Sequence, residues 1–380
     1  MRPQPGSSGG GAARLARPRA GSARPSVLFV TNHVPPDRAG AFAALHEREG
    51  IELALFGGRS HHATAGLDDP GVPHRRVGER DVHALAASGR YRAVVCGTAG
   101  RVALPAAWLG ARRAGVPFVL WSALWAELGT PAHVAARPLM ATIYRTAAAV
   151  VAYGPHVAAY ARRHGARRVH LAPQAVDNDW WATGARPAAA DGPLRALFVG
   201  RDAPEKGLAV LREAWSVAGL HVSDAALTLA GAEEAGAVTQ PWRRDAVAEL
   251  GHVGPEQLRN LYGSAGVLVV PSVGSRSFRE PWGLVVNEAM NQHVAIVASD
   301  AVGAAAGGLV REGRNGLVVR GGDPYALAVA LRRLHADAPL VARLAAQAAH
   351  DVRAYTFEAW AAGFAEALDP VRAARDGGRG

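Results

Sequence analysis

Short apolar runs alternate with longer helical stretches along most of this chain. The run SVLFVT, Ser26–Thr31, is apolar at nearly every position, and stretches such as Val102–Ala114 and Pro155–His164 are predicted helices between such runs. Continuous apolar strands separated by helices predict a parallel sheet that is covered on both faces. The strands expected in the first half are Ser26–Thr31, Ile51–Phe56, Arg92–Gly97, Val116–Trp121 and Ala148–Tyr153.

A segment rich in Pro, Ala, Gly and Asp, Ala172–Pro193, interrupts this alternation and has the composition of a linker. The alternation then restarts. We therefore expect an α/β protein with two Rossmann-like domains facing a cleft, residues 26–175 and 194–355, joined by a linker at 176–193. In such sheets, ligands bind beyond the carboxyl ends of the strands. The strands expected in the second half are Leu194–Gly200, Ala225–Gly231, Gly266–Ser272, Val294–Asp300 and Gly316–Gly321, and the expected helices are Gly207–Val217, Pro324–His335, Pro339–Arg353 and Phe357–Leu368.

The composition agrees with a folded two-domain protein. The chain has 380 residues, of which 49% are hydrophobic and 19% charged, and domains usually contain roughly 100–200 residues. No apolar stretch is long enough for a transmembrane helix. Residues 1–25 are rich in Gly, Ser, Pro and Arg and predict a disordered basic tail without the apolar core of a secretory signal. The single cysteine, Cys96, excludes an intramolecular disulfide and a multi-cysteine zinc site, so we expect a cytoplasmic protein.

The net charge of +10 predicts acidic partners, such as nucleotides, phosphosugars or an anionic membrane face. The arginines are scattered rather than clustered, which argues against nucleic acid. Peripheral contact with the inner face of a membrane is compatible with this charge. Lys206 is the only lysine among the 42 lysine and arginine residues, and its uniqueness marks it as a candidate functional residue.

The loop GRDAPEKG, Gly200–Gly207, joins an expected strand to an expected helix. The free amides at the start of such a helix favour a phosphate, and the Arg201 guanidinium can bind phosphate oxygens with two donors. Lys206 adds a compact charge on a flexible stem. The loop is not a Walker motif, because Gly207 follows the lysine. The alternative is that Lys206 is an ordinary solvated residue at a helix start.

Two carboxylates with seven residues between them lie in the stretch REPWGLVVNEAM. Glu280 is expected on a loop and Glu288 on a helix that starts near Gly283. The amides of Trp282, Gly283 and Leu284 would then face an anion, and each carboxylate can accept hydrogen bonds from a pair of sugar hydroxyls. The alternative is a pair of ordinary glutamates on a helix face.

Four motifs occur together in one order: FVGRDAPEKG, HVGPEQLRNLYGSAGVLVVPS, REPWGLVVNEAMNQHVAIVASDAVG and REGRNGLVV. Over about Leu194 to Arg320 they resemble the carboxyl-terminal domain of family-4 retaining glycosyltransferases, which have the GT-B fold. The resemblance implies that the second domain binds a nucleotide-sugar donor, and that a last helix, residues 356–369, returns to the first domain. It further implies that Arg201 and Lys206 hold the diphosphate, that Glu280 contacts the donor sugar and that Glu288 contacts the ribose. The donor site implied in this way also includes Gly200, Trp282, Gly283 and Leu284.

The first half resembles the family less closely. The loop HVPPDRAG takes the place of the family's glycine-containing loop that faces the phosphates, with Gly40 as the nearest candidate. Many members carry a histidine after a middle strand, and Val95–Gly100 has none. His33 is a candidate contact to the donor sugar, with a surface residue as the alternative. Residues predicted to line the acceptor side, or else to be core aromatics, are Trp121, Trp125 and Glu127.

We expect no cofactor and no obligatory metal. Asp177 and Asp179 form an Asp-x-Asp pattern that other glycosyltransferases use for a divalent ion, but they fall in the expected linker, away from any strand end. His61 and His62 are adjacent, but no carboxylate or cysteine flanks them, so a loop is expected there rather than a metal site. The nucleotide sugar is accordingly a substrate, and no metal site is predicted.

The resemblance implies a retaining, metal-independent hexosyltransferase that uses a nucleotide sugar, and a UDP-sugar is expected because UDP is common in the family. In this class the acceptor hydroxyl attacks from the face that the leaving group vacates, as the resemblance implies. The acceptor stays open among a cell-envelope polysaccharide, a glycolipid and a specialised metabolite. The alternatives are an inactive partner protein that binds nucleotide sugar, and an epimerase or phosphorylase with the same fold.

Overall fold

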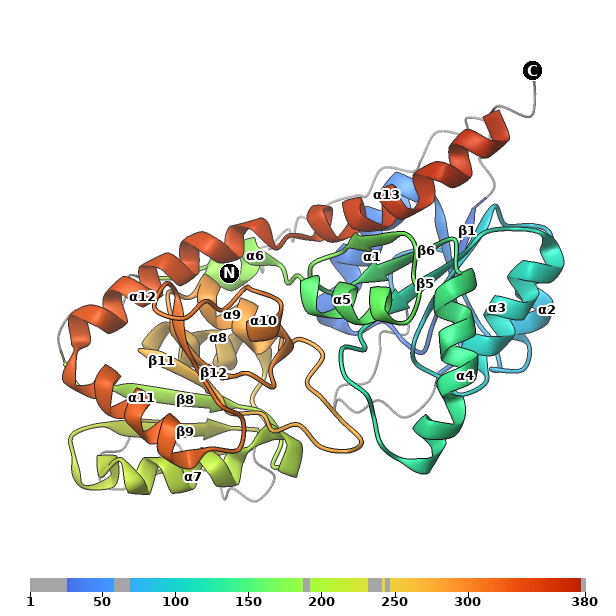
Figure 1. Cartoon of the computed structure of the whole chain (residues 1–380). Coiled ribbons are helices and arrows are strands. Elements are labelled where there is room, and N and C mark those ends of the chain that lie inside the picture. The colour runs from blue at the N-terminus through green and yellow to red at the C-terminus, as the bar shows by residue number, and fades with distance from the viewer. Residues whose placement is uncertain (1–25, 58–68, 187–191, 232–240, 243–246, 377–380) are drawn as a thin grey trace, which may run out of the picture.

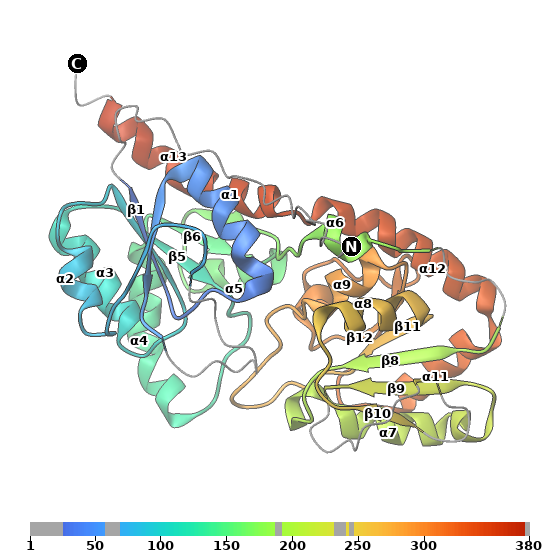
Figure 2. The same cartoon turned by 180° about the vertical axis from the view of Figure 1, so that it is seen from behind.

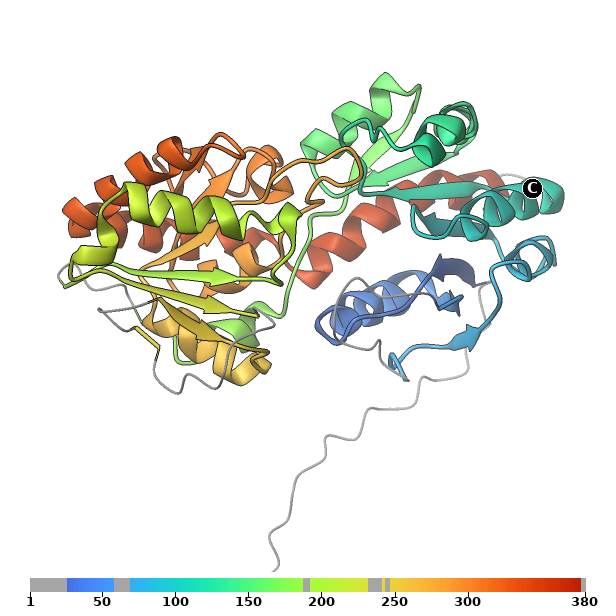
Figure 3. The ribbon, with the colours of Figure 1, turned by 90° about the horizontal axis from the view of Figure 1, so that it is seen from below.

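The computed structural model describes residues 26–57, 69–186, 192–231, 241–242 and 247–376, so the predicted tail at 1–25 and the expected loop at His61 and His62 lie outside it. Two parallel sheets of seven and six strands lie side by side, each with helices on both faces (Figure 1). We refer to them with their helices as the first and second domains. A linker and the long last helix connect the two domains, as the view from below makes clear (Figure 3).

The first domain is built on a fully parallel sheet whose central strands are buried on both faces. Its strands are β1 (Val27–Thr31), β2 (Ile51–Leu55), β3 (His74–Arg76), β4 (Ala93–Gly97), β5 (Phe118–Ser122), β6 (Ala149–Ala152) and β7 (Val169–Leu171). Its helices are η1 (Pro36–Arg38), α1 (Ala39–Glu49), α2 (Val82–Ala86), α3 (Ala103–Ala114), α4 (Pro131–Thr146) and α5 (Pro155–Arg163). The strand order is β3-β2-β1-β4-β5-β6-β7.

The second domain repeats this plan with one strand fewer. Its strands are β8 (Arg195–Val199), β9 (Ala226–Ala230), β10 (Ala248–Leu250), β11 (Val267–Val270), β12 (Ala295–Ser299) and β13 (Gly316–Val319). Its helices are η2 (Pro204–Lys206), α7 (Leu208–Val217), η3 (Leu220–Val222), α8 (Pro255–Ser264), α9 (Val285–Asn291), α10 (Gly303–Ala306), α11 (Pro324–Ala336), α12 (Ala338–Asp351) and η4 (Val352–Ala354). The strand order is β10-β9-β8-β11-β12-β13, so the order along the sheet switches between β8 and β11. In parallel sheets of this kind, ligands bind at the carboxyl ends of the strands beside such a switch point.

The last helix, α13 (Phe357–Asp376), lies against α1 and against β6 and β7 of the first domain (Figure 2). Trp360 and Phe364 of this helix are fully buried and pack with Phe29 of β1. A Cβ atom on Gly40 would collide with the ring of Phe357, so this glycine permits the close packing of α1 on α13. The end of the chain therefore completes the core of the first domain.

The linker contains a short helix, α6 (Asn178–Ala182), that is bound to the second domain. Asn291 of α9 donates to the side chain of Asn178 over 2.9 Å, and Arg259 of α8 stacks on Trp180 at 4.3 Å. Asp177 caps the helix by accepting from the Trp180 amide. The Asp177 carboxylate of the Asp-x-Asp pattern thus has a local structural role. The contacts of Asn178 and Trp180 show that α6 packs with the second domain.

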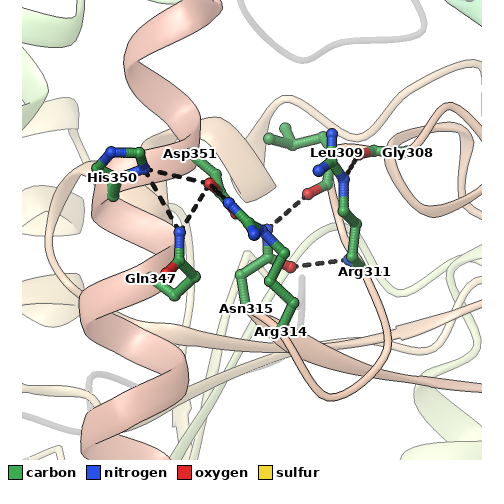
Figure 4. A network of polar contacts seen from close by, with 8 residues as sticks. All are labelled: Gly308, Leu309, Arg311, Arg314, Asn315, Gln347, His350 and Asp351. Atoms are coloured by element: carbon green, nitrogen blue, oxygen red, sulfur yellow. Dashed lines mark hydrogen bonds and ion pairs between the residues drawn. The ribbon is translucent and has the colours of Figure 1, made fainter.

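A hydrogen-bonded network ties the loop before β13 to helix α12 (Figure 4). The Asp351 carboxylate accepts two hydrogen bonds from Arg314, at 2.8 and 2.6 Å, and others from Asn315 and Gln347. These donors hold the pKa of Asp351 well below its usual range, with the Arg314 hydrogen bond the largest cause. The buried Asn315 amide also donates to Leu309, so Asp351 fixes the shape of this loop.

Replacing Asp351 with alanine is expected to destabilise the second domain. The change leaves the buried Asn315 amide without one of its acceptors, and an unsatisfied buried donor costs about 1–3 kcal/mol. Urea unfolding followed by circular dichroism measures the change. Because the folded-state pKa is lowered, the stabilisation from Asp351 is present above its unfolded pKa and is lost as the pH falls. Wild type and variant should therefore converge in acid, and a constant difference at all pH values would contradict this account.

Candidate active site

The turn after β8 places Lys206 beside the carboxyl end of the second sheet. Gly207 follows it with a φ of 71° and lies so close to the Pro271 carbonyl that no side chain fits there. The Val273 amide donates to the Glu205 carbonyl over 2.9 Å, which fixes the turn to the loop after β11. The Lys206 stem lies near Gly200, at ordinary van der Waals distance from where a Cβ atom on that glycine would lie. Arg201 is more exposed, with its guanidinium 3.9 Å from Glu205.

Glu280 lies on the loop between β11 and α9 and forms an ion pair with Lys206. The Lys206 Nζ and Glu280 Oε2 atoms are 2.5 Å apart, and the two side chains are only 23% and 10% exposed. The Gly303 amide donates to the Glu280 carbonyl, and the Trp282 carbonyl accepts from the Ala304 amide. The structure therefore brings together two predicted residues that lie 74 positions apart.

The helix carrying Glu288 begins at Val285, after Gly283 in the left-handed region and Leu284 at the cap. The predicted start near Gly283 was thus two residues early. Glu288 is 8% exposed, and Tyr262 of α8 donates to its carboxyl group over 2.9 Å. Burial raises the pKa of Glu288 to about 8, the Tyr262 hydrogen bond opposes this, and the charge of Asp37 adds to it. Burial therefore favours the protonated form of the Glu288 carboxyl group.

The first domain contacts this site through its predicted acceptor-side loop. Trp125 donates from Nε1 to the Glu280 carbonyl over 3.2 Å, and Arg279 lies over the Trp125 ring. His156, at the start of α5, lies 5.2 Å from Trp125 and donates from Nε2 to the Pro281 carbonyl. Burial lowers the pKa of His156 to about 4, so the ring is neutral. His156 was not among the predicted site residues, although it lies in the predicted helix Pro155–His164.

The other residues predicted in the first domain lie apart from this contact. Trp121 packs in the aromatic core against Phe29, at 5.6 Å between ring centres. Glu127 is half exposed and pairs with His164 and Arg137. Gly40 lies within α1 against α13 rather than in a loop, and the ring of His33 has a buried Nδ1 without a partner.

A further polar chain between the domains escaped the sequence reasoning. The Trp282 indole donates to Asn287 of α9 over 2.8 Å, and the Asn287 amide donates to the Gln174 carbonyl over 3.0 Å. Arg38 in turn donates to the Gln174 side chain. Asn287 precedes Glu288 and is fully buried, but a buried asparagine inside an apolar run carried no signal of its partner 113 residues away.

Two Rossmann-like domains, with a buried lysine–glutamate pair at the carboxyl edge of the second sheet, define a protein with the GT-B fold of glycosyltransferases. Residues 193–337, which make up most of the second domain, match the family described as Glycosyl transferases group 1. The predicted fold and the family resemblance are both confirmed.

Similar proteins extend this assignment. The chain is 40% identical over 118 residues to a D-inositol 3-phosphate glycosyltransferase of Streptomyces griseus, which covers 30% of this chain and 23% of that protein. It is also 32% identical over 215 residues to a D-inositol 3-phosphate glycosyltransferase of Stackebrandtia nassauensis. This match covers 50% of this chain and 46% of that protein. The matches thus span less than half the length of these two relatives.

Solved structures share the whole fold at low identity. Anabaena HepE, solved in complex with UDP-glucose, superposes with a TM-score of 0.67 at 18% identity and covers 91% of this chain and 99% of its own. Sucrose-phosphate synthase from Thermosynechococcus elongatus superposes with a TM-score of 0.67 at 20% identity and covers 92% of this chain and 100% of its own. At these identities the likeness establishes the fold.

None of the described helices has the length and apolar character that a membrane span requires. Within the same residues, His, Cys, Asp and Glu side chains do not gather in groups of three or more that could hold a metal ion.

Proposed function

We propose that this protein is a retaining glycosyltransferase that moves a sugar from a nucleotide-sugar donor, a UDP-sugar, to a hydroxyl group of its acceptor without an obligatory metal. The observation that carries the proposal is the Lys206–Glu280 ion pair, formed by the two motifs that match the family and placed at the carboxyl edge of the second sheet. The complex of HepE with UDP-glucose supports the choice of donor.

The ion pair gives both partners a role in donor binding. Without donor, the Glu280 carboxylate neutralises Lys206 at 2.5 Å. We propose that the donor diphosphate takes the place of this carboxylate beside the ammonium, and that Glu280 then turns to the hydroxyls of the sugar. Arg201, which is already exposed near the same turn, adds a two-pronged contact to the diphosphate. The residues of the donor site thus exchange one buried charge for another.

Transfer then requires stabilisation of the departing group. The bond between the anomeric carbon and the phosphate oxygen breaks, and the acceptor oxygen forms the new bond on the same face. The acceptor proton passes to the departing phosphate oxygen, and the nucleoside diphosphate leaves. Lys206 and Arg201 stabilise the charge that grows on the diphosphate, which is the usual source of catalysis by fixed charges. Trp125 and His156 hold the backbone around Glu280 from the first domain.

The acceptor remains a separate question, with a cell-envelope polysaccharide, a glycolipid and a specialised metabolite as the candidate classes. The name of the relatives adds inositol 3-phosphate to the compounds that an assay should include. We place the reaction in the cytoplasm, with peripheral contact at the membrane for a lipid acceptor.

The test is donor cleavage by the purified full-length chain. We expect slow release of nucleoside diphosphate from a UDP-sugar, with little release from GDP-, ADP- or dTDP-sugars, and full activity in the presence of EDTA. Addition of the true acceptor should increase the rate. Loss of activity in EDTA would overturn the metal-independent mechanism. Donor binding without release, with every candidate acceptor present, would favour an inactive binding protein, and no binding of any nucleotide sugar would refute the proposal.

A further inference from the structure

Arg38 carries a buried guanidinium group, and the adjacent Asp37 acts on it through its charge without forming an ion pair. It follows β1 at the carboxyl edge of the first sheet and is 7% exposed. Its Nη1 donates to the neutral side chain of Gln174, while Nε and Nη2 have no partner among the described residues. No ion pair involves Arg38 among the residues that the structure describes. A buried charge with so little compensation is costly unless a ligand completes it.

The two free nitrogens of Arg38 form one edge of the guanidinium group. The Nε and Nη2 hydrogens point in the same direction, which is the geometry that binds two oxygens of one phosphate or carboxylate group. The third nitrogen is held by Gln174, so the free edge has a fixed orientation. The guanidinium carbon lies over the rings of Trp121 and Trp360, at 5.9 and 5.8 Å from the two ring centres.

Three side chains around Arg38 carry further donors that have no partner in the part of the chain that the structure describes. The indole nitrogens of Trp121 and Trp360 and the amide nitrogen of Gln174 are buried, and each is without a partner. All three side chains contact the guanidinium group. An arrangement of donors around one cation is complementary to an oxyanion, whereas a purely structural arginine is normally paired with a carboxylate, as Arg92 is with Glu49 in this domain.

We propose that Arg38 binds an oxyanion of the phosphate class carried by the acceptor, with its free Nε–Nη2 edge toward the anion. The proposal rests on the transferase function and assigns the acceptor a negatively charged group. The free edge is covered in this conformation, so binding requires the side chains around Arg38 to move. Gln174, which bonds both Arg38 and Asn287 of the second domain, connects this site with the relative position of the domains.

The experiment measures the unfolding midpoint of the full-length chain with inorganic phosphate at constant ionic strength, and needs no turnover. Saturating UDP is present, so that the donor site is filled. In the wild type we expect phosphate to raise the midpoint by about 2–4 °C. Arg38→Met removes the charge and keeps an apolar side chain among the rings, so it should melt at or above the wild-type temperature and show no response to phosphate. Arg38→Lys keeps the charge without the two-pronged edge and should show a reduced response.

Arg92→Met is the matched control, because Arg92 is equally buried but paired with Glu49. It should melt at a lower temperature and keep the phosphate response. If Arg38→Met instead loses stability as Arg92→Met does, or fails to fold, Arg38 is a structural brace and the proposal is wrong. A phosphate response seen only without UDP would assign the anion to the donor and overturn the acceptor assignment. No response in the wild type would also overturn it, while the donor-cleavage assay would still stand on its own.

Discussion

Replacing Lys206 with alanine is expected to lower the rate of donor cleavage by about 10²–10³-fold, the effect of losing one fixed charge at a developing anion. Lys206 is largely buried and is the cation nearest to Glu280, so no other ammonium in the chain can replace it. Release of nucleoside diphosphate at saturating donor measures the loss. Lys206→Arg keeps the charge, but a planar guanidinium group cannot place that charge beside Glu280 as the compact ammonium does, so we expect partial activity.

The alanine variant also leaves the Glu280 carboxylate buried without its partner, which lowers stability for a reason unrelated to catalysis. The double variant Lys206→Ala with Glu280→Gln removes both charges and is the control. It should recover the unfolding midpoint without recovering activity. If the single variant retains a rate within about threefold of wild type, Lys206 does not stabilise the leaving diphosphate.

The sequence predicted the strands of both sheets best where they are buried on both faces. Within the predicted strand Gly266–Ser272, the residues Val267–Val270 are all apolar and all buried, and burial on both faces requires that pattern. The edge strands β3, β7 and β10 were missed, because residues such as Arg75 and His170 are polar and only the neighbouring strand makes them β-structure. Tertiary pairing, rather than local composition, decides such edges.

The site was predictable where chemistry is concentrated in a short motif. Lys206 and Glu280 were identified separately by their motifs, and the structure brings them together as an ion pair. The contacts from the first domain were harder, because Trp125 meets Glu280 through a backbone carbonyl, which has no sequence signature. Arg38 looked like one arginine among many, since only its burial beside Gln174 distinguishes it.

Replacing Glu288 with glutamine is expected to raise stability and weaken donor binding. Burial raises the pKa of Glu288 to about 8, against about 4.5 when unfolded, so the folded chain keeps a proton that the unfolded chain releases. Because the folded-state pKa is raised, the stability that wild type derives from this group is fully present below the unfolded pKa and is lost as the pH rises toward 8. Glutamine carries no such penalty and still accepts from Tyr262. The advantage of the variant should grow between about pH 5 and pH 8, to a few kcal/mol at most.

The same substitution should weaken binding of UDP by about 10–100-fold, the usual value of hydrogen bonds to a charged group, if the ionised carboxylate accepts the two ribose hydroxyls. Titration calorimetry at about pH 6.5 and pH 8.5 tests this, since wild-type affinity should rise with pH relative to the variant. Glu280→Gln is the matched control, because Glu280 is paired with Lys206 and its loss should not stabilise the chain. A variant that is more stable and yet binds UDP as wild type does would mean that Glu288 is buried for packing alone. Burial of the Glu288 carboxyl group lowers the stability of the folded chain. The unfolding measurement and the UDP titration together decide whether donor binding is the reason that a carboxyl group occupies this position.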